Sequence, residues 1–367
     1  MIHMKSFTFA FAGVVGAMLL AGCEVAGSAS EDVGQDAEEL TGSRTCNPQA
    51  TSGSLIAGTE LLVALENGGV VALDPRSGVK LHAYATGPNA FGAAFSIDGE
   101  RAFVTDKDAG TFVEIDPASD VVKSTLPIGA TPQQLAIAGN RAFVALNGEA
   151  AVAVIDISST PTVLRKISMG AGTKPHTLSV SPDASKLWVA SQGIDPRVTS
   201  IPLTATGEGQ ATDYRYDIVP RVIAASNKSA FFTGHNSTGL HTIGVDGKPA
   251  TPFLDEPGAF SEARKQVEGA WTNADGTLAG LTHEGKKALT VLRFDVTGKS
   301  QVVREIKNLV DVPYWVTVDP SERVAYVSIP NAGKVQAWDL THCSRKPLWT
   351  ADVGGKAKRM NMKSCGQ

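Results

Sequence analysis

The sequence is poor in cysteine and aromatic residues, and its charge is nearly balanced. Four cysteines in 367 residues are too few for a disulfide-rich scaffold, and 33 basic against 37 acidic side chains give no general attraction for nucleic acid. There is no Gly-x-Ser-x-Gly elbow, phosphate loop, Cys-x-x-Cys-His haem attachment or HExxH helix. The common local signatures of hydrolases, NTPases, c-type cytochromes and zinc proteases are therefore missing, and neither a cofactor nor a metal is predicted.

The amino end carries a short apolar run. Lys5 precedes this run, which extends from Phe7 to Leu20, is short for a permanent transmembrane helix and is typical of a secretory signal. It ends in Leu20-Ala21-Gly22-Cys23, which resembles the processing box of bacterial lipoproteins. The resemblance implies a signal peptide over residues 1–22, a lipidated Cys23 and a lipid-anchored protein of the bacterial cell envelope, on the periplasmic side or at the cell surface. An ordinary signal with a chance cysteine is the alternative.

Residues 23–50 read as an acidic, flexible tether. Six acidic residues, one basic residue and no aromatic residue lie between Glu24 and Thr45. Such a segment cannot bury enough apolar surface to fold. The tether accounts for the net charge of the chain, so the remaining body, residues 51–367, is electrically neutral overall.

A short apolar strand recurs about every 40 to 48 residues, as in repeat proteins. Its seven copies begin at Glu60, Arg101, Arg141, Lys186, Ser229, Thr277 and Val324. A second strand, usually ending in Asp, follows each copy after a turn, and another strand, commonly led by Pro, precedes it. With a fourth stretch, the unit has four antiparallel strands. The pattern predicts an all-β fold, a seven-bladed β-propeller of four-stranded antiparallel blades.

The strand count closes in only one way. If the strands of a blade are lettered A to D from the axis outward, the last A strand spans Arg359 to Ser364, whereas the first B strand opens at Glu60. The C-terminal inner strand must therefore join the N-terminal blade. This closure removes the open sheet edges that would otherwise pair with other chains.

Two short motifs resemble a known family. Phe-Val-Thr-Asp at residues 103–106 and Ser-Pro-Asp at residues 181–183 are similar to the YVTN-type seven-bladed propeller repeats of bacterial surface and periplasmic proteins, over roughly residues 55 to 365. The resemblance implies the propeller fold. It implies no single function, because this family and its relatives include binding proteins, lactonases and cofactor-bearing redox domains.

The strand path sorts the loops onto two faces. The D-to-A and B-to-C loops lie on one face, called face one, and the A-to-B and C-to-D loops lie on the other. The residue after the leading Pro, or its equivalent by spacing, lies in every blade where the central channel opens on face one. These seven positions, the ring residues, are Phe91, Gln133, His176, Arg221, Glu268, Tyr314 and Arg359.

The ring residues are the candidate functional site. Two Arg, one Glu and one His suit a small anionic or hydroxylated ligand held by charge-assisted hydrogen bonds. The candidate ligand-binding residues are Gln133, His176, Arg221, Glu268, Tyr314 and Arg359, and the candidate catalytic residues are His176 and Glu268. The alternative is that these groups pair with one another and simply fill a water-containing central channel.

Other conspicuous residues have simpler explanations. His235 and His283 lie at B-strand ends on face one, but with His176 they come from three blades without ligand spacing, so no metal site is predicted. The Asp residues that end the C strands are expected to cap backbone amides. The long connection from Gly247 to Glu268 is either a lid over the channel mouth or a decorative loop.

Three cysteines remain besides Cys23. A disulfide between Cys365 and either Cys46 or Cys343 would pin the closing strand, and the third thiol has no assigned role. All three cysteines, and the tether, fall on the face opposite the channel mouth. Face one is therefore expected to point away from the membrane.

Three function hypotheses follow. The first is a non-enzymatic, lipid-anchored extracytoplasmic propeller whose membrane-distal face binds an envelope protein or a small anionic or hydroxylated ligand. The second is a lactonase-like hydrolase acting on an anionic sugar lactone, with His176 or Glu268 activating water. The third is a periplasmic redox or cofactor-binding domain, which no cofactor fingerprint favours.

Overall fold

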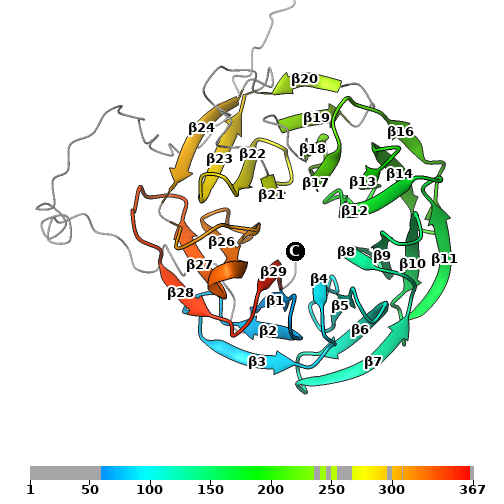
Figure 1. Cartoon of the computed structure of the whole chain (residues 1–367), viewed down its shortest axis with the longest axis horizontal. Helices are drawn as coiled ribbons and strands as arrows, with labels where there is room; N and C mark the ends of the chain where they lie inside the picture. The colour runs from blue at the N-terminus through cyan, green and yellow to red at the C-terminus, as the bar shows by residue number, and fades with distance from the viewer. Residues whose placement is uncertain are drawn as a thin grey trace, which may run out of the picture.

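The computed structural model describes residues 59–234, 240–244, 249–253, 267–295, 300–307 and 309–363. These residues form seven antiparallel sheets arranged radially around a central axis (Figure 1). Besides the strands they contain a short 3-10 helix, Pro330–Ala332. Within this part of the chain, no helix is long and apolar enough to cross a membrane. The seven-bladed β-propeller predicted from the repeats is confirmed.

Every blade is a short meander that runs from the axis outward. Blade 1 contains β29 (Ala357–Met362), β1 (Leu61–Leu65), β2 (Val70–Leu73) and β3 (Lys80–Tyr84). Blade 2 contains β4 (Ala90–Phe95), β5 (Ala102–Asp106), β6 (Thr111–Asp116) and β7 (Val121–Pro127). Blade 3 contains β8 (Pro132–Ala138), β9 (Arg141–Leu146), β10 (Ala151–Asp156) and β11 (Thr162–Ser168).

The other blades follow the same order, with one exception. Blade 5 contains β17 (Pro220–Ala225), β18 (Ser229–Gly234), β19 (Leu240–Gly244) and β20 (Pro249–Phe253). Blade 6 contains β21 (Val267–Thr272), β22 (Leu278–His283), β23 (Ala288–Phe294) and β24 (Ser300–Ile306). Blade 7 contains β25 (Trp315–Val318), β26 (Val324–Ile329), β27 (Lys334–Asp339) and β28 (Trp349–Asp352).

Blade 4 departs from the predicted four strands. It contains β12 (Thr173–Val180), β13 (Lys186–Gly193), β14 (Arg197–Thr204), β15 (Gly207–Glu208) and β16 (Thr212–Tyr214), and both β15 and β16 pair with β14. The outer edge is split because the chain turns back at once after β14. The turn carries Glu208 into ion pairs with Arg141 and Arg165 of blade 3.

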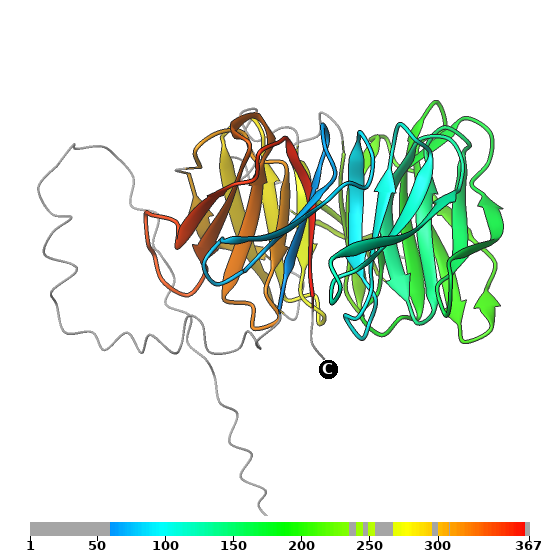
Figure 2. The same cartoon turned by 90° about the horizontal axis from the view of Figure 1, so that it is seen from below.

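The first and last strands of the ring lie in one sheet. β29 pairs antiparallel with β1, where Leu61 lies opposite Met362 and Val63 lies opposite Met360. Figure 2 shows β29, in red, beside β1, in blue. The predicted closure by a C-terminal inner strand is therefore confirmed.

Burial follows from the radial packing. Every residue of β1 and of β5 is buried, because the middle of a blade has a neighbouring blade against each of its faces. Such strands read in the sequence as continuous apolar runs rather than as an alternation. The outer strand β7 has one neighbour strand and is largely exposed.

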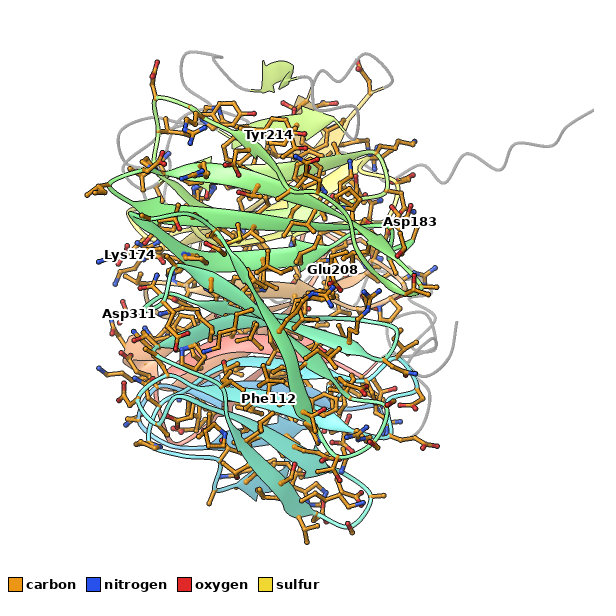
Figure 3. The ribbon with its side chains drawn as sticks, turned by 90° about the vertical axis from the view of Figure 1, so that its right-hand side faces the viewer. Phe112, Lys174, Asp183, Glu208, Tyr214 and Asp311 are labelled. Atoms are coloured by element: carbon orange, nitrogen blue, oxygen red, sulfur yellow. The ribbon has the colours of Figure 1, made fainter. Side chains whose placement is uncertain are left out.

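The loops sort onto two faces as the strand path predicts. In Figure 3, Lys174 and Asp311, which precede the ring residues of two blades, lie at one face, and Asp183 lies at the other. Lys287, in a loop between the second and third strands of blade 6, forms an ion pair with Asp311 at 2.7 Å. On the opposite face, the Asp183 amide donates to Asn227 Oδ1 at 2.8 Å.

The Asp residues that end the third strand of the blades are fold devices. Asp74, Asp116, Asp156 and Asp339 each accept a hydrogen bond from the backbone amide two residues further along, at 2.7–3.0 Å. The predicted capping role is confirmed for these four. They hold the turns on the face opposite the channel mouth and form no carboxylate pair.

Several predictions fall outside the described residues. They concern the signal peptide, Cys23, the tether, Cys46, Cys365, His235 and most of the connection from Gly247 to Glu268. Cys343 is described and is disulfide-bonded. Because the other cysteines lie outside the described residues, the pairing stays a prediction.

Candidate functional site

A β-bulge places the ring residues at the channel. In six of the seven blades the pairing of the innermost strand with its neighbour shifts register at or beside the ring residue. The shift lies between Pro175 and Thr177 around His176, and between Pro220 and Val222 around Arg221. A bulge removes a residue from the regular alternation of side chains and re-aims it. In blade 7, β25 begins at Trp315, directly after Tyr314.

Hydroxyl groups fix the bulged backbone to the preceding blade. Thr105 Oγ1 donates to the Gln133 carbonyl at 2.6 Å, and Thr177 Oγ1 donates to the Arg221 carbonyl at 2.8 Å. Ser328 Oγ donates to the Lys358 carbonyl at 2.6 Å. Because of the register shift, these carbonyls have no hydrogen-bond partner within their own sheet, and the hydroxyl groups supply one. The same bonds set the spacing between blades.

Two glycines directly after ring residues allow neighbouring inner strands to approach closely. A Cβ atom on Gly92 would lie 2.8 Å from the Gln133 carbonyl oxygen, and one on Gly269 would lie 2.7 Å from the Tyr314 carbonyl oxygen. A larger residue at either position would push two blades apart at the channel wall.

Arg221 and Glu268 form the central ion pair of the ring. The Arg221 Nε and Nη2 groups both donate to Glu268 Oε2, at 2.9 and 2.7 Å. The Arg221 side chain is 20% exposed and that of Glu268 is 8% exposed. This charge-assisted pair holds the guanidinium in a fixed orientation at the channel mouth, with part of its surface open to solvent.

His176 lies next to this pair and is neutral at physiological pH. Burial, followed by the positive charges of Arg359 and Arg221, lowers the pKa of His176 well below its ordinary value. Its ring meets the Phe91 ring edge to face, with 6.2 Å between centroids. Its Nδ1 atom is buried without a hydrogen-bond partner among the described residues. A neutral imidazole of this kind is able to accept a proton.

Arg359 is almost completely buried, at 2% exposure. Its guanidinium lies between two aromatic rings, with its carbon 4.6 Å from the centroid of Phe91 and 4.5 Å from that of Trp315. Its Nη1 group donates to Gln134 Oε1. The sequence predicts Arg359 as a ligand-binding residue, and in the structure its almost completely buried side chain lines a cavity in the channel.

The remaining ring residues complete a mixed apolar and basic rim. Gln133 is buried at 3% exposure, and Tyr314 packs under Lys358, whose Nζ lies 4.4 Å from the Tyr314 ring centroid. Lys107 Nζ lies 5.5 Å from the Phe91 ring centroid. Glu268 offsets Arg221, and Glu66 pairs with Lys358 at 3.1 Å, so the positive charge that favours an anionic ligand comes from Arg359 and Lys107.

The structure brings the ring residues together, and it also shows contacts that the sequence did not reveal. Gln134 and Trp315, the partners of Arg359, are neighbours in sequence of ring residues but carry no motif. His283 lies at the end of β22, as the sequence predicts, and is fully buried. Among the described residues no group of three or more His, Cys, Asp or Glu could hold a metal ion.

A cavity of about 200 Å³ occupies the channel beyond Arg359. Its lining includes Arg359 and Gln134 together with residues further along the inner strands, such as Ser179, Thr272 and Asn361. His176, Arg221 and Glu268 do not line it. Because the inner strands run away from face one, this cavity extends from the Arg359 guanidinium towards the opposite face.

No family model and no curated protein matches this chain. Its fold is that of the seven-bladed β-propellers, and several solved structures share it. A periplasmic gluconolactonase from Pseudomonas aeruginosa is 17% identical with a TM-score of 0.68, over 84% of this chain and 99% of that one.

Two further structures are similar to the same extent. A Lactobacillus plantarum protein is 17% identical with a TM-score of 0.67, over 83% of this chain and 99% of that one. A candidate 6-phosphogluconolactonase from Bacteroides uniformis is 14% identical with a TM-score of 0.67, over the same shares. At these identities the likeness establishes the fold alone.

Proposed function

We propose that the protein is a lactone hydrolase whose site lies at the channel mouth on face one. The observation that carries the proposal is the adjacency of a neutral, partly buried His176 to the Arg221–Glu268 ion pair. A base, an oriented guanidinium and a basic rim are what hydrolysis of an anionic lactone requires. The periplasmic gluconolactonase and the candidate 6-phosphogluconolactonase, which have a similar fold, support the proposal of lactone hydrolysis.

The residues divide the reaction between them. His176 accepts a proton from water as the water oxygen bonds to the lactone carbonyl carbon. Arg221 stabilises the negative charge on the carbonyl oxygen. The bond between the carbonyl carbon and the ring oxygen then breaks, and the His176 imidazolium returns its proton to the departing ring oxygen. One lactone and one water give one hydroxy acid.

Glu268 has a different role from the one that the sequence first allowed. Its Oε2 atom already accepts two hydrogen bonds from Arg221. A carboxylate that accepts two hydrogen bonds from one guanidinium serves to orient its partner. We therefore assign proton transfer to His176 and the positioning of Arg221 to Glu268.

The test is a hydrolysis assay with the purified full chain. Glucono-1,5-lactone and its 6-phosphate are the probes, and acid release is followed with a pH indicator. We expect turnover of at least one lactone, and a decrease of about 100-fold or more in kcat/KM for Arg221→Ala, since loss of an oxyanion donor costs about 10²–10³. Lys123→Ala, on the outer strand β7, should retain full activity. Equal turnover in both variants would contradict the assignment.

The same geometry fits a binding protein without turnover, because several ring side chains pair with one another. In that case the lactones and their acids would bind saturably but would not be consumed, and Arg221→Ala would weaken binding without affecting any rate. Calorimetric titration with gluconate, beside the hydrolysis assay, separates these two outcomes.

We further propose that Cys23 carries a lipid and that the propeller is extracytoplasmic. The apolar run before Cys23 and the acidic tether after it support this location in the cell envelope, as does the fold shared with a periplasmic protein. Cys23→Ser should release the protein from the membrane fraction in soluble form. A variant that stayed in that fraction after salt and carbonate washes would overturn the anchor.

A further inference from the structure

The channel cavity beyond Arg359 has the properties of a second ligand site. The guanidinium of Arg359 lines it, is 2% exposed, and has its Nε and Nη2 groups buried without a hydrogen-bond partner. Buried charged groups in proteins are ordinarily paired, because an unpaired ion loses its hydration without compensation. The structure therefore holds a fixed positive charge against a cavity whose lining contains no counter-charge.

No acidic side chain in the described part of the chain compensates Arg359. The Tyr314 side chain interacts with the Arg359 guanidinium, and the Glu268 carboxylate attracts it, but the Glu268 Oε2 atom is taken by Arg221. Phe91 and Trp315 offer the faces of their rings to the guanidinium plane. Such contacts fix the plane, yet they leave the N–H groups at its edge in need of acceptors.

Two other polar groups of the cavity also offer protons, whereas the Thr272 hydroxyl already donates to the Leu278 carbonyl at 2.8 Å. Asn361 Oδ1 accepts the Phe95 amide at 3.1 Å, so its side-chain amide nitrogen remains as a donor. Ser179 Oγ accepts the Ala225 amide at 3.1 Å, which leaves its hydroxyl proton available. The lining contains no Asp or Glu. A cavity of donors with one fixed cation selects a ligand rich in acceptor oxygens.

We propose that this cavity binds a small oxyanion, a carboxylate or a phosphate group, with Arg359 as its charged partner and Asn361 as a second donor. Its volume of about 200 Å³ admits an ion of that size with a few waters. The site is distinct from the proposed hydrolytic site, because its lining includes none of His176, Arg221 and Glu268. It opens towards the face opposite the channel mouth.

The test measures binding of inorganic phosphate and of acetate to the full chain. Each is titrated in a thermal unfolding assay and by calorimetry, at constant ionic strength with chloride. A ligand that binds only the folded state raises the melting temperature with a saturating dose dependence. We expect saturable binding of at least one of the two anions, and the comparison shows which oxygen group the cavity prefers.

Two variants address the cavity in different ways. Arg359→Met removes the charge with similar length, and Ala270→Leu fills the cavity but keeps the charge. Both should weaken anion binding at least tenfold, and Asn361→Ala should weaken it by a smaller factor. Lys123→Met, on an outer strand, is the matched control and should bind as the wild type does.

Two results would overturn the proposal. One is the absence of saturable binding of either anion up to tens of millimolar. The other is binding that persists unchanged in Ala270→Leu, which would place the anion at the surface. Should Arg359→Met fail to fold, Ala270→Leu and Asn361→Ala decide the question. Lactone hydrolysis is not part of this readout, so the two proposed sites can fail independently.

Discussion

At the residue scale, His176 determines how the protein responds to mild acid. Its pKa is held well below the ordinary value by burial and by the charges of Arg359 and Arg221. In the unfolded chain the same histidine binds a proton at about pH 6.5. Between that pH and the lowered pKa, the unfolded state therefore binds more protons than the folded state, and folding stability decreases as the pH falls.

The wild type should lose stability as the pH falls from 7 to 5, with a slope that approaches about 1.4 kcal/mol per pH unit for this one group. His176→Gln cannot titrate and should show a smaller slope. Urea unfolding at a series of pH values measures these slopes, and identical slopes in wild type and His176→Gln would refute this role.

The same shift predicts the pH profile of hydrolysis. Because neutral His176 is the proposed base, kcat/KM should stay constant from pH 8 to below 6.5 and decrease only when the ring becomes protonated at its lowered pKa. A profile that falls with a midpoint near the ordinary histidine value would show that another group is the base. Buffers of matched ionic strength keep the charged mouth equally screened across the series.

The sequence predicts the positions of the ring residues but not their partners. The spacing after each leading Pro is enough to find His176 and Arg221, because every blade repeats the same path. That Glu268 pairs with Arg221, and that the Arg359 guanidinium is buried against the rings of Phe91 and Trp315, depends on side-chain orientations at the bulges. A repeat pattern carries no information on those orientations.

At the element scale, the hydroxyl bonds between blades explain a residue choice that the sequence left unexplained. Thr105 Oγ1 donates to the Gln133 carbonyl at 2.6 Å and accepts the Gly92 amide at 2.9 Å. The Thr of the Phe-Val-Thr-Asp motif therefore forms a hydrogen bond between two neighbouring blades. The motif identifies the strand, but only the ring geometry gives the hydroxyl its partner.

Thr105→Val should destabilise the protein by about 1–3 kcal/mol, since the same shape is kept while two buried backbone groups lose their partner. Thr125→Val, on the exposed strand β7, is the matched control and should change stability by less than about 0.5 kcal/mol. Chemical denaturation of both variants measures the difference. Equal stability of the two variants would mean that water replaces the lost hydroxyl.

At the scale of the whole molecule, the closing strand was predictable because the arithmetic of repeats allows one solution. The sequence contains seven second strands, the first of which begins at Glu60. Only six inner strands lie between them, so the seventh inner strand must come from the carboxyl end. The structure bears this out in the pairing of β29 with β1. The split outer edge of blade 4, where both β15 and β16 pair with β14, was not predicted, because this blade departs from the repeat pattern.

Deleting the last nine residues, 359–367, should abolish sharp cooperative unfolding, because it removes most of β29 and exposes the inner edge of β1. Deleting residues 364–367 leaves β29 whole and is the control. Both are compared with the full chain under reducing conditions, by calorimetry. A nine-residue deletion that unfolded as sharply as the full chain, at the same temperature, would contradict closure by this strand.

The pairing of β29 with β1 also constrains the order of events during biosynthesis. Translation delivers β1 about three hundred positions before its inner neighbour, so a nascent chain can build at most an incomplete arc. Throughout elongation, that arc exposes an unsatisfied strand edge and two unpacked sheet faces to whatever surrounds the ribosome or the translocation machinery. Ring formation is consequently a late, all-or-nothing event. A premature stop codon upstream of β29 would yield an aggregation-prone fragment instead of a functional, shorter protein.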